Sequence, residues 1–166
     1  MIRKIFFGVL IVGILFTGFF PKYQLNTSVW SPGGAWTSNQ EIQLYAWMKE
    51  ELPKESFVYP LSTRDQNVIG FDMYSCKYCE GVKSFRNSEP LSKSVDEWHD
   101  FLVENNYDYL LIDAGMTLKY GQKWQGLEEE YIIKNINRLV EEINKDSRFR
   151  TVYFNDVGAI FAIQKE

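Results

Sequence analysis

The first 20 residues carry the feature that most restricts what this chain can become. Two basic residues, Arg3 and Lys4, precede residues 5–20, which are uncharged and nearly all apolar. A helix needs about 20 residues to cross a hydrocarbon core of roughly 30 Å. Residues 1–20 supply that length if the two basic side chains reach toward the headgroups. We therefore expect one N-terminal transmembrane helix, which attaches the chain to a membrane through residues 5–20.

The charges beside this segment predict its orientation. Basic residues that flank a membrane helix favour the cytoplasmic side, so Arg3 and Lys4 place the rest of the chain outside the cytoplasm. A cleaved signal peptide has the same charged start and a similar apolar core, and a helix buried in a soluble protein is a third alternative. The absence of an A-x-A-like cleavage site near residues 16–21 favours the uncleaved anchor. The anchor and the signal peptide imply the same localisation.

The remaining residues have the length of one small domain. We expect an anchor over residues 1–21, a linker over 22–37 and an extracytoplasmic α/β domain over 38–166. Within the linker, Asn26 begins an N-x-Ser sequon and is a candidate glycosylation site. The net charge is −4 and the charges of both signs are mixed. This distribution argues against nucleic acid as a partner, because phosphate binding requires clustered Lys and Arg.

Apolar spacing and capping residues predict the elements of the domain. Capping boxes begin at Ser38 and Ser94, and a later segment has apolar residues at a 3.6-residue period. The predicted helices are 38–51, 94–105 and 128–145. Runs of apolar residues and the turn at 155–158 predict the strands. They are 57–61, 107–113, 151–154 and 159–163, and residues 68–74 form a further strand or an extended segment.

The order of these elements predicts the fold class. Strands that alternate with helices form a sheet with parallel strands, and helices cover it. We expect an α/β fold with a mixed, mostly parallel sheet of about five strands and a C-terminal antiparallel hairpin. Residues 75–93 and 114–127 are predicted to be irregular, because they are polar or contain several glycines.

The motif Cys76-Lys77-Tyr78-Cys79 has three interpretations. Outside the cytoplasm, two cysteines favour a disulfide. A redox-active pair needs a thiol of lowered pKa at the N-terminus of a helix, and Glu80-Gly81 is a poor helix start. Half of a zinc site would need more ligands, and only His99 and carboxylates remain. We predict the Cys76–Cys79 disulfide, and we expect no metal and no cofactor.

Three charged residues follow the predicted strands. Open parallel sheets bind ligands at the carboxyl ends of their strands, where this sequence has Arg64, Asp65 and Asp113. They are candidate ligand-binding residues; alternatively, Arg64 and Asp65 are solvated loop residues and Asp113 caps a turn. Two acids do not define a glycosidase, since that chemistry also needs a particular carboxylate separation. We assign no catalytic residue.

Three segments share a pattern with a known family. They are Tyr45-x-Trp47-Met48-Lys49-x3-Pro53-Lys54-x3-Val58, the strand 107–113, and the pair 149–155 and 159–163. Together they resemble the extracytoplasmic soluble domain that follows the last membrane helix in GT-C-class membrane glycosyltransferases. That class includes oligosaccharyltransferases and mannosyltransferase-like enzymes. The resemblance covers about residues 41–163 and implies a soluble domain outside the cytoplasm.

The resemblance carries over no catalytic residue. The family places its catalytic carboxylates on loops between many membrane helices, and this chain has one predicted membrane helix. The acceptor motif Trp-Trp-Asp-Tyr-Gly is also absent, and residues 59–65 read Tyr-Pro-Leu-Ser-Thr-Arg-Asp instead.

The resemblance thus implies a non-catalytic accessory or binding module of a surface glycan or glycoprotein assembly system. Its partner would be a multi-spanning glycosyltransferase or a glycan. The alternatives are a small extracytoplasmic hydrolase or transferase, and a thiol–disulfide protein that uses Cys76 and Cys79.

The apolar segment generates a prediction about topology. Protease added to intact cells or protoplasts should digest the domain, because the positive-inside rule places it outside the cytoplasm. Mass spectrometry of the mature chain should find the apolar segment, residues 5–20, still attached. A mature N-terminus within residues 18–24 would show a cleaved signal peptide instead, and protection from protease would contradict the orientation.

Overall fold

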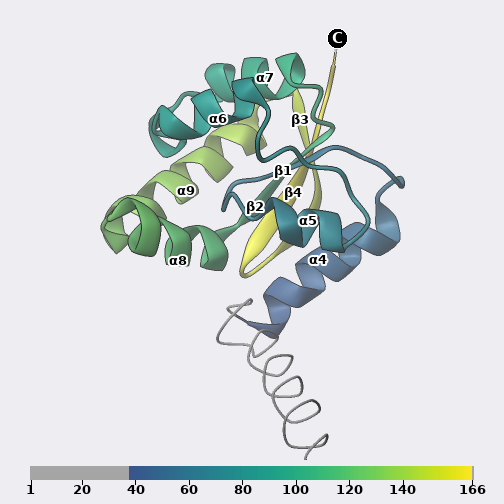
Figure 1. Ribbon diagram of the computed structural model, residues 1–166, viewed down its shortest axis with the longest axis horizontal. Coiled ribbons are helices and arrows are strands. Elements are labelled where there is room, and N and C mark those ends of the chain that lie inside the picture. Colours follow the sequence, from purple (N-terminus) through teal and green to yellow (C-terminus); the bar gives the residue numbers. More distant parts are fainter. Residues whose placement is uncertain (1–37, 166) are drawn as a thin grey trace, which may run out of the picture. The chain divides into compact units, whose positions relative to one another are not determined.

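Residues 38–165, which are those described in the computed structural model, form an α/β domain (Figure 1). Four strands form one sheet in the order β1-β2-β4-β3. β1 (Val58–Pro60) pairs in parallel with β2 (Tyr109–Asp113), and β2 pairs antiparallel with β4 (Gly158–Ile163). The hairpin of β3 (Phe149–Asn155) with β4 completes the sheet. The mixed α/β fold and the hairpin are confirmed. The expected five strands and mostly parallel pairing are wrong for these residues, since β1–β2 is the one parallel strand pair here.

The helices follow local sequence signals in three cases. The helices predicted over 38–51, 94–105 and 128–145 are α4 (Asn39–Glu51), α7 (Val95–Glu104) and α9 (Glu129–Lys145). At α7, the Ser94 hydroxyl accepts from the Glu97 amide, and the Glu97 carboxylate accepts from the Ser94 amide, so the capping box is complete. At α4, Ser38 accepts from the Glu41 amide. The other helical segments are α5 (Asp65–Gly70), α6 (Glu80–Asn87), α8 (Ala114–Gln125) and the 3-10 helix η2 (Pro90–Ser92).

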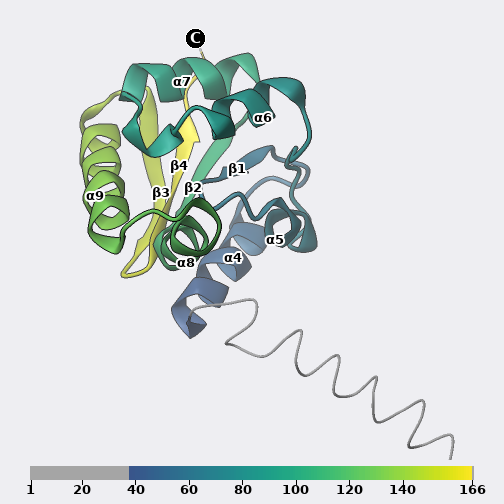
Figure 2. The same ribbon diagram turned by 60° about the vertical axis from the view of Figure 1, so that its left-hand side comes forward.

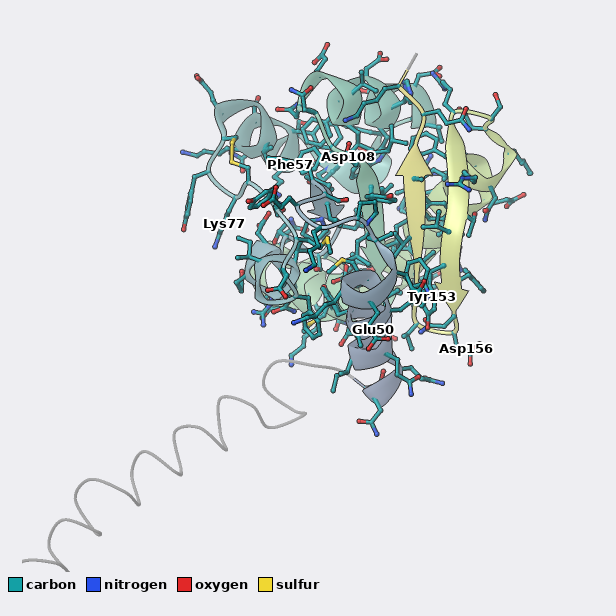
Figure 3. All side chains as sticks on the ribbon, turned by 90° about the vertical axis from the view of Figure 1, so that its right-hand side faces the viewer. Glu50, Phe57, Lys77, Asp108, Tyr153 and Asp156 are labelled. Atoms are coloured by element: carbon teal, nitrogen blue, oxygen red, sulfur yellow. A yellow bond between two sulfur atoms is a disulfide. The ribbon has the colours of Figure 1, made fainter. Side chains whose placement is uncertain are left out.

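Helices cover both faces of the sheet. In Figure 1, α6 and α9 lie on one side of the strands and α4 lies on the other, and Figure 2 shows the same elements from a second direction. The strands alternate between these layers: Leu110 and Ile112 join the core beneath α6, α7 and α9, whereas Leu111 pairs with Ile160 on the opposite face. Figure 3 views that face, where α4 lies in front of the strands and Tyr153 of β3 lies beside it. The Trp47 ring of α4 stacks on Tyr153 at 4.7 Å between centroids.

Aromatic side chains fill much of the larger core. Tyr59 is buried at the centre, and edge-to-face contacts surround it at centroid distances from 5.2 to 6.4 Å. Rings in this arrangement bury large apolar areas and add a favourable quadrupole interaction. These aromatic residues therefore form core, and the rings around Tyr59 are Phe85, Trp98, Phe101 and Tyr107.

The strand predicted over residues 68–74 is wrong. The chain turns instead into α5, and Tyr74 contributes only an isolated parallel bridge to Phe57. A short apolar run has no periodicity that separates strand from helix. Val68 is buried and Ile69 is 53% exposed. One turn of helix is enough to bury Val68 while the chain remains at the edge of β1.

Two segments predicted to be irregular contain helices. Residues 75–93 hold α6 and η2, and residues 114–127 hold α8. The glycines of the second segment predict a break in regular structure, but α8 accommodates them. A Cβ atom at Gly121 would lie 2.7 Å from the Ile132 side chain, so this glycine allows α8 to approach α9. Gly126 has a φ of +65° and ends α8 in the left-handed conformation.

The predicted transmembrane helix, the linker and the candidate sequon at Asn26 lie outside the described residues. Between residues 38 and 165, no helix combines the length and apolarity that a membrane span requires.

The close approach of β4 to β2 predicts a large effect at Gly158. A Cβ atom there would lie 2.3 Å from the Ile112 carbonyl oxygen and 2.6 Å from the Leu44 side chain. A backbone atom cannot rotate away, so Gly158→Ala should lower the free energy of unfolding by roughly 2–3 kcal/mol. Urea denaturation of residues 38–166 measures this.

Gly70→Ala is the matched control, since no atom lies within 4 Å of a Cβ placed at this residue of α5. Its free energy of unfolding should be unchanged or higher by up to about 1 kcal/mol. Equal losses in the two variants would contradict the close packing at Gly158.

Candidate functional site

The carboxyl ends of the two parallel strands meet at one edge of the sheet. Asp113 ends β2, and Ser62 lies two residues beyond the end of β1. The Ser62 hydroxyl donates to Asp113 Oδ2 at 2.5 Å, and the Ser62 amide donates to Oδ1 at 3.2 Å. Parallel pairing of β1 with β2 is what brings these two residues together, although 51 residues separate them in the chain.

Other elements complete a buried network around this carboxylate. The Tyr45 hydroxyl on α4 donates to Asp113 Oδ2 at 2.6 Å, and the Thr117 hydroxyl on α8 is 3.4 Å from Oδ1. Glu41 is buried one turn before Tyr45, and its Oε1 accepts from the Met116 amide at 3.0 Å. We call Glu41, Tyr45, Ser62, Asp113 and Thr117 the Asp113 cluster.

Burial changes the acidity of this cluster. Removal from water raises the pKa of Asp113 from 3.8 to about 6; hydrogen bonds from Ser62 and Tyr45 oppose this rise, and the charge of Glu41 adds to it. Burial, with the nearby Asp113 carboxylate, also raises the pKa of the Tyr45 phenol well above 10. Asp113 has an exposed fraction of 0%. A substrate in solution therefore cannot contact this acid, and its contacts are those of a structural group.

Asp65 belongs to a second network. It is 1% exposed, and Arg86 of α6 donates to both of its oxygens, at 2.9 and 3.0 Å. The Ser75 hydroxyl donates to Asp65 Oδ1 at 2.7 Å. The Arg86 guanidinium also lies over the ring of Tyr59, 5.0 Å from its centroid. A paired, bidentate carboxylate of this kind anchors α5 to α6.

Arg64 lies against α8. Its guanidinium is 4.5 Å from the centroid of the Tyr120 ring, and Nη1 donates to the Tyr120 hydroxyl. Its Nε atom is buried and has no hydrogen-bond partner among the described residues. The preceding Thr63 has a φ of +62°, which is uncommon for a β-branched residue. The loop after β1 is therefore held in a strained form.

Two neighbouring cavities open at this edge of the domain. The smaller is about 90 Å³ and reaches the Asp113 cluster through Ser62 and Thr117. The larger is about 670 Å³ and lies between the segment from α6 to η2 and the turn from α8 to α9. Both are lined by Pro90, Leu91 and Gln125. The larger cavity is also lined by Arg86, Asn87, Glu89, Gly126, Leu127, Glu128 and Tyr131.

The predicted disulfide is confirmed. Cys76 and Cys79 are bonded to each other, with their Cα atoms 5.7 Å apart. The expectation that Glu80-Gly81 begins no helix is wrong, because α6 begins at Glu80, directly after Cys79. The disulfide thus fixes the start of the helix that carries Arg86.

The zinc interpretation loses its thiolates, since both sulfur atoms are in the disulfide. Across residues 38–165, no group of three His, Cys, Asp or Glu side chains could hold a metal ion. His99 packs edge-to-face on Phe149, and its Nε2 is 3.2 Å from the Gln164 carbonyl oxygen.

The candidates Arg64, Asp65 and Asp113 do lie near the carboxyl edge, but in three different environments. Asp65 faces Arg86, Arg64 faces Tyr120, and Asp113 faces Tyr45 and Ser62. Ligand binding by them stays a prediction. The residues that α6 and α8 contribute are not predicted from the sequence, because both segments have the composition of irregular structure. For α6, the spacing of Val82 and Phe85, which are both buried, is a signal that could have found the helix.

The fold is similar to that of a solved structure. Residues of this chain superpose on the C-terminal globular domain of oligosaccharyltransferase from Archaeoglobus fulgidus with a TM-score of 0.51 and 14% sequence identity. The match covers 76% of this chain and 97% of that domain. The resemblance seen in the sequence is thereby confirmed at the level of the fold. A scan against protein-family models and a search of curated proteins gave no match.

The Asp113 cluster predicts how stability changes with pH. Between the ordinary pKa of 3.8 and the folded pKa of about 6, the folded chain binds more protons than the unfolded chain. The free energy of unfolding therefore falls as pH rises through this window, by about 3 kcal/mol for a pKa difference of this size. Asp113→Asn should remove this loss, and urea denaturation from about pH 4 to pH 7 measures it.

Glu97→Gln is the control. Hydrogen bonds from Ser94 and Lys93 lower the pKa of Glu97 from 4.5 to about 2. The ionised carboxylate therefore stabilises the folded chain above pH 4.5, and this stabilisation is lost only as pH falls toward 2. Its unfolding curve should parallel the wild type between about pH 5 and pH 7. Parallel pH profiles for Asp113→Asn and the wild type would contradict a raised pKa at Asp113.

Proposed function

We propose that this chain is a membrane-anchored, non-catalytic accessory module of a surface glycan or glycoprotein assembly system. One observation carries the proposal: the domain has the fold of the C-terminal globular domain of an oligosaccharyltransferase. The predicted anchor and the positive-inside rule place the module at the cell membrane with its domain outside the cytoplasm. Its partner is a multi-spanning glycosyltransferase or a glycan.

The contacts of the acids support a non-catalytic role. A general acid or base must reach the reacting group of a substrate. Asp113 is enclosed by Tyr45 and Ser62, and Asp65 has Arg86 on both oxygens. Each of these acids stabilises the junction of several elements. Because both acids are held in structural contacts, we expect this edge of the domain to bind a partner and not to catalyse a reaction.

The loop after β1 supports a binding role. Strained backbone and unsatisfied buried groups persist where the surrounding structure holds them, and they cluster at functional sites. Thr63 and Arg64 show both features, next to the two cavities. Arginine is also over-represented among the residues that dominate protein interfaces. We therefore place the contact with the glycosyltransferase at this loop.

Association with a partner is tested in the native membrane. The tagged full chain, solubilised with mild detergent, should copurify with a multi-spanning glycosyltransferase identified by mass spectrometry. Arg64→Ala should weaken this association by at least about tenfold. Arg150→Ala is the matched control, because Arg150 is an exposed arginine on the edge strand β3. Equal retention in both variants would contradict the role of the loop.

Activity of the purified full chain separates the alternatives. We expect neither glycosyl transfer nor hydrolysis of sugar, ester or lipid-linked sugar substrates, and no oxidation of a dithiol peptide. Turnover that Asp65→Asn or Asp113→Asn abolishes would identify a small enzyme. Disulfide exchange that Cys76→Ser abolishes would identify a thiol–disulfide protein.

A further inference from the structure

The larger cavity is lined by polar side chains that are available to a ligand. Five of them, from four separate segments, make no side-chain hydrogen bond or ion pair with any described residue. Glu89 precedes η2 without capping it, and Glu128 precedes α9 in the same way. By contrast, Arg86 and Arg138 nearby have their donors occupied by protein oxygens. The five are Asn87, Glu89, Gln125, Glu128 and Tyr131.

The walls that carry these side chains are held in place by other residues. On one side, the Pro90 carbonyl accepts from the Trp98 indole at 3.1 Å, and the Leu91 carbonyl accepts from Arg138 at 2.9 Å. On the other side, the amides of Gly126 and Leu127 both donate to the Gly121 carbonyl. A cavity with fixed walls loses little conformational entropy when it binds a ligand.

The chemistry of the lining complements hydroxyl groups. The amides of Asn87 and Gln125 donate and accept, the carboxylates of Glu89 and Glu128 accept, and the Tyr131 hydroxyl does both. A sugar hydroxyl needs both kinds of partner. The ring of Tyr131 also offers an apolar surface against which a C–H face of a sugar can pack. A volume of about 670 Å³ lies within the range of small-molecule sites.

The charges of the lining restrict the ligand further. The one cation, Arg86, is already neutralised by Asp65. Glu89 and Glu128 have no cationic partner within the described residues, so the cavity carries net negative charge. An anionic ligand such as a sugar phosphate or a uronic acid would be repelled.

From these observations we infer that the cavity between η2 and the α8–α9 turn binds an uncharged saccharide through Gln125 and Tyr131. The inference deepens the proposed function and rests on it, because the ligand would be a glycan of the assembly system. It differs from the partner contact at Arg64, because Arg64 does not line this cavity.

Binding is tested on the full chain by saturation-transfer NMR and calorimetry, in a detergent without a sugar headgroup. The probes are α-1,4-galactobiose, N,N′-diacetylchitobiose and α-1,2-mannobiose. At least one should bind, and Tyr131→Ala or Gln125→Ala should weaken its Kd roughly tenfold. Tyr131→Phe, which keeps the ring, should lose less affinity. Tyr78→Ala is the matched control on the disulfide loop, where Tyr78 is 82% exposed, and its Kd should equal that of the wild type.

A charged disaccharide tests whether the negative charge of the cavity excludes anions. Digalacturonate matches galactobiose except for its two carboxylates, and it should bind at least about tenfold more weakly than the best neutral disaccharide. Absence of binding by all three neutral probes, or equal binding of digalacturonate, would overturn the inference. So would Tyr131-dependent binding of a neutral peptide, acetyl-tetraalanine amide, without saccharide binding.

The two proposals fail separately. If no saccharide binds but the chain still copurifies with a glycosyltransferase through Arg64, the cavity assignment is wrong and the proposed function stands. If a saccharide binds at Tyr131 but no glycosyltransferase copurifies, the chain is a glycan-binding module without that partner.

Discussion

The buried carboxylate of Asp113 is the interaction on which the arrangement of this domain depends. It has no exposure, so internal donors must replace the water that it loses on folding. Those donors are Tyr45 on α4, Ser62 after β1 and Thr117 on α8. Because they come from three separate segments, all three must reach their native positions before the acid is satisfied. The cluster therefore couples a helix on one face of the sheet to the edge where both cavities open.

This edge has an inner and an outer layer with different roles. The inner layer consists of the Asp113 cluster and the Asp65–Arg86 pair, whose polar atoms are occupied by one another. The outer layer consists of side chains around the larger cavity, such as Gln125 and Tyr131, which the domain leaves unpaired among its described residues. A binding site needs polar groups that are free to contact a ligand and a rigid support that holds them in place. Here the outer layer provides the groups and the inner layer provides the support. Catalysis by Asp113 or Asp65 would require that carboxylate to reach a substrate in the cavity, and both are buried and bonded to protein donors.

Elements with short-range causes were predicted well from the sequence. The capping box at Ser94, the 3.6-residue period of α9 and the turn between β3 and β4 each depend on residues within a few positions of one another. At the turn, the Asn155 side-chain oxygen accepts from the amides of Val157 and Gly158. The disulfide is also local, since three positions separate Cys76 from Cys79. Such interactions are visible in a sequence because their partners are neighbours in it.

The errors occurred where distant packing decided the local conformation. α8 contains glycines that weaken a helix in isolation, yet Gly121 is the residue that lets α8 approach Ile132 of α9. The run at 68–74 had no period of its own, and the chain there followed the burial of Val68 into α5. A pattern of single residues does not contain this information, because the favourable contact is made by another part of the chain.

The candidate site also combines features that local sequence predicts with features that depend on distant contacts. From the sequence alone came the α/β class, the family-like fold, the disulfide and the position of Arg64, Asp65 and Asp113 after strands. Only the tertiary structure decided what each acid does: Arg86 reaches Asp65 across 21 positions, and Tyr45 reaches Asp113 across 68. The physical reason is that the ionisation and accessibility of a carboxylate depend on its surroundings. Two aspartates that follow strands look alike in the sequence, and folding surrounds one with a guanidinium and the other with hydroxyls.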